Sequence, residues 1–298
     1  MDKIQKVTIV GSGTQGSMLA FRSAVYGRDV RIYDVDQNAI DKALNKIKIW
    51  FYVYVKEGKI TKDFSEKALN SIFVTLDLEK ALDGVDLVIE NVPEILKLKQ
   101  TVWEEIDSIA PADTLLTTNS SSLKSSDIGA NVKRKDKTFN VNFMTPTKDD
   151  LVEVMWNSKT SEETKRKAIV FLKDQNNIPI ITSKEIKGFS LNRVWRAMKK
   201  ECLRLWSEGY ISPEDFDRAF ILEWNTEYGP FALMDKVGLD IVKQIEMTYY
   251  DESGDSSDLP PKELEDMINK GWLGEKSGKG FYEYPNPAYQ RSKWLRGK

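Results

Sequence analysis

The chain has 298 residues, a length typical of two domains, and 41% of them are hydrophobic, which is enough for sizeable cores. Its 44 basic and 46 acidic residues nearly cancel, so the charge favours neither a nucleic acid nor a membrane as partner. The single cysteine, Cys202, excludes an internal disulfide, and without a visible secretory signal or apolar span we expect a cytoplasmic protein. The sequence contains no histidine, so the commonest acid–base side chain of enzymes is absent.

The N-terminal part of the chain alternates predicted strands and helices. Residues 6–10 form a short apolar, β-branched run that is typical of a buried parallel strand, and a helix is predicted from about Thr14 to Tyr26. A second helix begins near Asn38. Further strands are predicted at residues 30–33, 86–92, 114–118, 141–143, 151–155 and 178–182.

After Gly188 the pattern becomes helical almost throughout, with Pro213, Pro230 and Pro260 at plausible helix starts. Alternating strands and helices followed by helices alone predict an α/β fold: a mostly parallel sheet, then an all-α C-terminal domain. We expect the first domain to span residues 1–186 and the second to span residues 187–298.

Residues 11–16 read Gly-Ser-Gly-Thr-Gln-Gly and lie between the first strand and the first helix. In such a turn Gly11 permits the sharp bend, Gly13 lets the backbone approach a pyrophosphate, and Gly16 lets the helix pack on the strand. Asp34 ends the second strand, where a carboxylate binds ribose hydroxyls and repels a 2′-phosphate. The pattern predicts a Rossmann-type domain that binds NAD through Gly11, Gly13, Thr14, Gln15, Gly16 and Asp34.

Six later segments resemble the NAD-dependent 3-hydroxyacyl-CoA dehydrogenase family. They are LVIENVPEILKLKQ (87–100), TNSSSL (118–123), FNVNFMTPTKDDLVEV (139–154), KGFSLNR (187–193), YGPFALMDKVGLD (228–240) and GWLGEKSGKGFYEYP (271–285). The resemblance implies an NAD-binding domain and a helical domain that forms a homodimer, with a small-molecule substrate held between the two domains.

The same resemblance implies roles for single residues. The cofactor would be contacted by Glu94, Lys99, Asn119, Ser121, Thr145 and Lys276. Ser121 would also face the substrate carbonyl, and Asn192 would reach the substrate from the first helix of the second domain. Glu153 matches the glutamate that holds the family's catalytic histidine. The predicted catalytic set is therefore Glu153, Ser121, Asn142 and Asn192.

Asn142 marks the main departure from the family pattern. It stands where the family has its catalytic histidine, 23 residues after Asn119, which is the family spacing; Thr145 replaces the asparagine before Pro146. An asparagine can hydrogen-bond a carbonyl or hydroxyl but cannot transfer a proton in the useful pH range. We therefore expect poor activity as a standard 3-hydroxyacyl-CoA dehydrogenase.

Two further segments depart from the family. In relatives that use acyl-CoA, the helix after the second strand is rich in lysine and serine, whereas residues 49–55 here read Ile-Trp-Phe-Tyr-Val-Tyr-Val. These aromatic residues either pack in a core or dimer contact, or line a pocket for a substrate without CoA. Residues 148–150, Lys-Asp-Asp, either face water or attract a cationic substrate.

Three functions remain compatible with the sequence. The favoured one is hydride transfer between NAD and a 3-hydroxy or 3-keto compound other than a standard acyl-CoA, with Glu153 as the acid–base group, directly or through water. The second is reduction of a C=N bond or oxidation of an amine, with Glu153 stabilising the cation and Trp50, Tyr52 or Tyr54 adding cation–π attraction. The third is an inactive NAD-binding protein.

Overall fold

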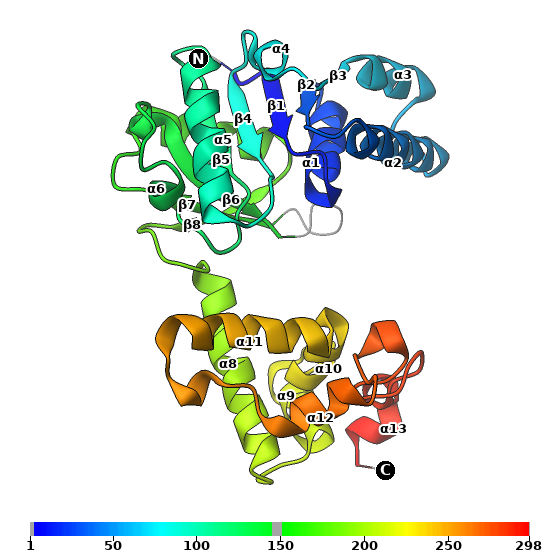
Figure 1. The fold of residues 1–298 in the computed structure, drawn as a ribbon. Coiled ribbons are helices and arrows are strands. Elements are labelled where there is room, and N and C mark those ends of the chain that lie inside the picture. Colours follow the sequence, from blue (N-terminus) through cyan, green and yellow to red (C-terminus); the bar gives the residue numbers. More distant parts are fainter. Residues whose placement is uncertain (1–2, 145–150, 298) are drawn as a thin grey trace. The chain divides into compact units, whose positions relative to one another are not determined.

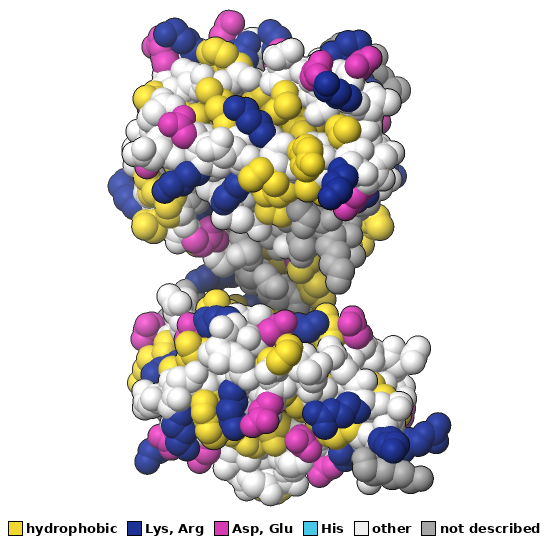
Figure 2. Space-filling model, turned by 90° about the vertical axis from the view of Figure 1, so that its right-hand side faces the viewer, with side chains coloured by type: hydrophobic (Ala, Val, Ile, Leu, Met, Phe, Trp, Pro, Cys, Tyr) yellow, Lys and Arg dark blue, Asp and Glu magenta, His cyan; other side chains and the backbone are white. Residues whose placement is uncertain are grey.

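The computed structural model describes residues 3–144 and 151–297, and the chain divides into two compact units, Met1–Ser190 and Leu191–Lys298. The N-terminal unit is a sheet with flanking helices, drawn blue to green in Figure 1, and the C-terminal unit is built from helices. Within the described residues, no helix has both the length and the apolar character needed to span a bilayer. On the face in view in Figure 2, basic and acidic side chains are interspersed.

The sheet has eight strands in the order β3-β2-β1-β4-β5-β6-β7-β8. Their bounds are β1 Lys6–Val10, β2 Asp29–Tyr33, β3 Ile72–Thr75, β4 Leu87–Glu90, β5 Leu115–Thr118, β6 Thr138–Phe143, β7 Leu151–Trp156 and β8 Ile178–Thr182. Every neighbouring pair is parallel except β6 and β7, which run antiparallel. The predicted α/β class, with a mostly parallel sheet and a helical C-terminal domain, is confirmed.

Helices cover both faces of the sheet, so the central strands β4 and β5 are buried on both sides. The helices of the N-terminal unit are α1 Thr14–Val25, α2 Gln37–Lys56, α3 Lys62–Asn70, α4 Leu78–Leu82, α5 Leu96–Ile109, α6 Ser125–Ile128 and α7 Glu162–Asp174. One core joins α1, α2 and α7 to the sheet, and a second core joins α4, α5 and α6 to its other face. β1 and β4 are neighbours, so the reversal of strand order that typically forms a binding crevice lies at their carboxyl ends.

The aromatic run in α2 mostly belongs to the core. Phe51 is fully buried, and the rings of Trp50, Phe51 and Tyr54 lie 4.8–5.6 Å from the ring of Phe21 in α1. The structure therefore favours the packing interpretation for these three side chains over a cation-binding pocket. Of the tyrosines and tryptophan considered for such a pocket, Tyr52 stays 68% exposed.

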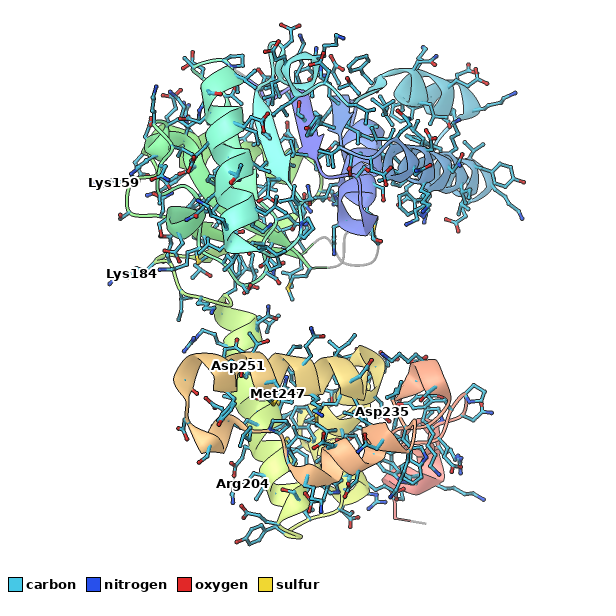
Figure 3. All side chains as sticks on the ribbon, viewed as in Figure 1. Lys159, Lys184, Arg204, Asp235, Met247 and Asp251 are labelled. Carbon is cyan, nitrogen blue, oxygen red and sulfur yellow. The ribbon has the colours of Figure 1, made fainter. Side chains whose placement is uncertain are left out.

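The helices of the C-terminal unit are α8 Ser190–Ser207, whose first residue still belongs to the N-terminal unit, α9 Pro213–Trp224, α10 Pro230–Val237, α11 Leu239–Ser253, α12 Lys262–Asn269 and α13 Ser292–Leu295. Two buried carboxylates organise it. Asp217 accepts hydrogen bonds from the backbone N–H groups of Phe231 and Ala232, at the start of α10. Asp235, which lies among the helices of this unit in Figure 3, accepts from the N–H groups of Phe281 and Tyr282. The bonds of Asp217 join α9 to α10, and those of Asp235 join α10 to the C-terminal segment.

Asp217 should make the stability of the protein depend on pH. Burial raises the pKa of Asp217 to about 6, although the Phe231 and Ala232 N–H groups and the Tyr282 hydroxyl oppose this rise. The native state then holds this proton more tightly than the unfolded state, so stability falls as the pH rises from about 4 to above 6. We expect the stability advantage of wild type over Asp217→Asn to shrink by about 2 to 3 kcal/mol across this window, measured by urea unfolding. Asp266→Asn, at an exposed site, is the control, and an advantage that grows with pH would contradict the prediction.

Candidate active site

The glycine-rich turn has the geometry that the sequence predicted. Gly11 has φ +96°, and a Cβ on it would lie 2.8 Å from the carbonyl oxygen of Asn91, which follows β4. A Cβ on Gly16 would lie 1.9 Å from the carbonyl oxygen of Gly11. By contrast, among residues 3–144 and 151–297 no atom lies within 4 Å of a Cβ on Gly13 and no side chain caps the start of α1. Gly13, Thr14 and Gln15 are exposed, so the first N–H groups of α1 can donate hydrogen bonds to the phosphates of a dinucleotide.

Asp34 is fixed at the carboxyl end of β2. Its Oδ2 accepts hydrogen bonds of 2.7 Å from the backbone N–H and the hydroxyl of Ser12, within the glycine-rich turn. Arg31, the nearby cation, donates instead to the carbonyl oxygens of Lys80 and Asp83. The guanidinium is therefore engaged with the backbone of α4 and of the residue that follows it. A carboxylate is held beside the turn, which suits the ribose hydroxyls of NAD.

A buried ion pair joins β4 to α5. The ammonium of Lys99 lies 2.8 Å from Glu90 Oε1 and donates to the carbonyl oxygen of Val92, and both charged side chains are at most 1% exposed. Thr118 on β5 donates to the other carboxylate oxygen. Burial raises the pKa of Glu90, while the positive charge of Lys99 and the Thr118 hydroxyl oppose the rise. Lys99 therefore joins α5 to the carboxyl end of β4 through a buried ion pair and a hydrogen bond.

Lys99→Met should destabilise the protein by about 3 to 5 kcal/mol, because it leaves the Glu90 carboxylate buried without its cation. The measurement is the free energy of unfolding in urea. Lys97→Met, at an exposed position of the same helix, is the matched control. A loss of unfolding free energy below about 1 kcal/mol, the range of exposed ion pairs, would show that the Lys99–Glu90 pair contributes little to stability.

Glu94 and the serines at positions 120–122 lie next to the Lys99–Glu90 ion pair, in the loops that follow β4 and β5. The Glu94 carboxylate accepts hydrogen bonds from the hydroxyls of Ser120 and Ser122 and lies 3.3 Å from the ammonium of Lys99. Partial burial acts to raise the pKa of Glu94, but these hydrogen bonds and the charge of Lys99 lower it overall. Ser121 stands between the two bonded serines and is exposed; among the described residues its hydroxyl has no hydrogen-bond partner, so it is available to a ligand.

Asn119 connects three strand ends. Its Nδ2 donates to Asn91 Oδ1 after β4, and its own Oδ1 accepts from the backbone N–H of Phe143 at the end of β6. Its position at the end of β5 places Asn119 at the same edge of the sheet as Gly11 and Glu94. The predicted residues Gly11, Gly13, Gly16, Asp34, Glu94, Lys99, Asn119 and Ser121 thus all belong to the carboxyl ends of β1, β2, β4 and β5 or to the segments that follow them.

Asn142 and Glu153 face each other across the antiparallel pair β6–β7. Asn142 Nδ2 lies 3.4 Å from Glu153 Oε2, and the two residues are 6% and 1% exposed. The other carboxylate oxygen, Oε1, accepts a hydrogen bond of 3.0 Å from the hydroxyl of Ser190. A buried carboxylate therefore stands beside the amide that occupies the position of the family's histidine.

The remaining predicted residues lie in the C-terminal unit or outside the described residues. Asn192 and Lys276 belong to the C-terminal unit, where Lys276 binds both carboxylate oxygens of Asp240 at 2.6 and 2.7 Å. Thr145 and the charged triplet at residues 148–150 lie outside the described residues.

Sequence reasoning missed several polar partners at this site, namely Glu90, Ser120, Ser122 and Ser190. Glu90 carried a usable signal, since a carboxylate at the end of an apolar strand needs a buried cation. The serines carried none, because their bonds join residues that are 26 to 37 positions apart.

The chain matches two family models. The model of the NAD-binding domain of 3-hydroxyacyl-CoA dehydrogenase matches residues 6–186, and the model of that enzyme's C-terminal domain matches residues 188–284. A probable 3-hydroxybutyryl-CoA dehydrogenase of Bacillus subtilis is 33% identical over 283 residues, covering 95% of this chain and 98% of the relative.

Two further relatives are named for other substrates. A 5-formyl-3-hydroxy-2-methylpyridine 4-carboxylate 5-dehydrogenase of Mesorhizobium japonicum is 29% identical, covering 94% of this chain and 91% of the relative. A solved diketoreductase, described as acting on dicarbonyl compounds, has a TM-score of 0.85 at 32% identity and covers 95% of this chain and 100% of its own.

Proposed function

Because the chain belongs to the 3-hydroxyacyl-CoA dehydrogenase family and is an NAD-dependent oxidoreductase of CH–OH groups, we propose that it interconverts a 3-hydroxy and a 3-keto compound with Glu153 as its acid–base group. The observation that carries this proposal is the pairing of buried Glu153 with Asn142. An amide cannot take the proton of the alcohol, whereas the adjacent carboxylate can.

Each group at the site would have one task. Bound NAD supplies the acceptor for the hydride. The turn with Gly11, Gly13 and Gly16 would hold the pyrophosphate, and Asp34 would hold the ribose hydroxyls. Ser121 and Asn142 would orient the reacting oxygen by hydrogen bonds, and Glu153 would accept its proton. The substrate-side role of Asn192 and the cofactor-side roles of Thr14, Gln15, Glu94, Lys99, Asn119, Thr145 and Lys276 stay predictions.

We propose further that the substrate carries no CoA. The names of the pyridine-carboxylate dehydrogenase and the diketoreductase describe substrates without CoA, so this architecture accommodates them. On α2, the apolar or aromatic side chains of Ile49 and Tyr52 are 60% and 68% exposed, although Lys46 and Lys48 are also exposed there. We propose that the active form is a cytoplasmic homodimer assembled through residues 187–298.

A substrate panel with NAD tests this proposal. We expect NADH formation with free 3-hydroxybutyrate, or NADH consumption with the 1,3-dicarbonyl acetylacetone, at a higher kcat/KM than with 3-hydroxybutyryl-CoA or acetoacetyl-CoA. A preference for the CoA esters would overturn the substrate assignment, and no turnover of any probe would overturn the reaction. An arm with added ammonium checks the C=N chemistry, which the relatives do not favour.

A further inference from the structure

Ser190, the first residue of α8, is held in place by an unusual backbone. Gly188 and Phe189 precede it with φ +79° and +54°, both in the left-handed region, and Phe189 is fully buried. The N–H of Gly188 donates to the carbonyl oxygen of Ser122, next to Ser121. A left-handed phenylalanine is strained and persists only where its surroundings fix it. Ser190 is therefore anchored to the loop that carries the predicted substrate-facing serine.

Ser190 and Glu153 differ sharply in exposure. Glu153 is 1% exposed, whereas Ser190 is exposed, and its hydroxyl lies 3.0 Å from Glu153 Oε1. A reacting hydroxyl outside the protein interior cannot easily touch a carboxylate that is buried to this degree. A proton from that hydroxyl must instead reach Glu153 through a neighbouring group.

Asn142 and Ser190, which both bond to the carboxylate of Glu153, differ in what they can transfer. The amide of Asn142 donates but cannot exchange its hydrogen for another within a catalytic step. A hydroxyl accepts one proton on its lone pair while it gives up its own. Of these two neighbours, only Ser190 can carry a proton inward.

Resting on the function proposed above, we propose that the Ser190 hydroxyl relays the proton between the reacting oxygen and Glu153. In the oxidation, the carbon-bound hydrogen leaves with its electron pair to NAD+, and the C=O bond forms. The alcohol proton passes to Ser190 Oγ, and the original hydroxyl proton of Ser190 passes to Glu153 Oε1. The relay runs backwards in the reduction.

The test compares Ser190→Ala with Ser190→Thr, which keeps a hydroxyl, and with Ser183→Ala, an exposed serine that precedes the same turn. The probe is whichever compound of the panel wild type turns over fastest, and the readout is the single-turnover rate of NADH formation or consumption. We expect Ser190→Ala to lower this rate by about tenfold to 10²-fold, with KM and NAD affinity unchanged. Ser190→Thr should keep a rate within about threefold of wild type, and Ser183→Ala should have the wild-type rate.

Two readouts separate a relay from a merely structural role. A plot of the single-turnover rate against the D2O fraction of the solvent should be curved for wild type and Ser190→Thr, because two protons move in the same step. The plot for Ser190→Ala should lose this curvature. The infrared carboxylate band of Glu153, identified by its loss in Glu153→Gln, should shift in Ser190→Ala and return in Ser190→Thr.

The outcomes distinguish this inference from the function beneath it. If Glu153→Gln slows turnover while Ser190→Ala keeps the wild-type rate and curvature, the relay is wrong and Glu153 remains the acid–base group. If Glu153→Gln keeps the wild-type rate, or wild type turns over no probe, the proposed function fails and the relay fails with it.

Discussion

Replacing Asn142 with histidine is expected to raise kcat by about 10² to 10⁴ with the fastest probe of the panel. Asn142 Nδ2 lies 3.4 Å from Glu153 Oε2 and faces it across β6–β7, so an imidazole there would donate one ring N–H to the carboxylate. The carboxylate would orient the ring and stabilise its protonated form, leaving the second nitrogen to act as base near neutral pH. The variant would then have the acid–base pair that the family pattern contains.

Asn142→Gln separates this chemical gain from a change of side-chain size. It enlarges the side chain at the same 6% exposed position but adds no titratable group. We expect it to be no faster than wild type. If Asn142→His is no faster than Asn142→Gln, the missing imidazole does not limit the rate of this enzyme.

Glu153→Gln is expected to lower kcat by about 10² to 10⁴, the usual contribution of a positioned acid–base group. The amide oxygen of glutamine can still accept a hydrogen bond from Asn142, and its NH2 group can donate to the Ser190 hydroxyl oxygen, so the shape of the site is retained. The amide cannot take up the proton of the alcohol. Steady-state assays with the same probe, together with NAD binding by fluorescence titration, measure the two effects separately.

The control for this variant is Glu66→Gln, whose carboxylate is largely exposed in α3. It should match wild type in both turnover and NAD binding. A Glu153→Gln enzyme with wild-type kcat would show that another group handles the proton. A loss of NAD binding in that variant would instead assign Glu153 a structural role.

The fold was largely predictable because strong local patterns marked it. Lys6–Val10 was predicted with the bounds that the structure has, since its β-branched residues are buried between β2 and β4. The strand Ile72–Thr75 was missed because it is four residues long and partly exposed, so its pattern is weak. The aromatic residues of α2 gave an ambiguous signal, and only their packing on Phe21 favoured one interpretation.

The site was predictable where one motif carries it and not where distant segments meet. Gly11, Gly16 and Asp34 follow from a turn and the strands that flank it, so their geometry was readable from spacing. The bond from Ser190 to Glu153 joins residues 37 positions apart, and no local pattern records it. The expected approach of Lys99 to the cofactor stays a prediction, and a single sequence could not reveal that its ammonium pairs with Glu90 in the interior.

The dependence of kcat on pH, in wild type and in Glu153→Gln, tests most directly whether Glu153 handles the proton of the reaction. The chain has no histidine, so an imidazole cannot contribute an inflection to this profile. We predict that the wild-type profile contains an inflection from the acid–base group and that Glu153→Gln removes it, leaving a slow rate that is flat over the same pH range. An inflection that persists unchanged in Glu153→Gln would contradict this account.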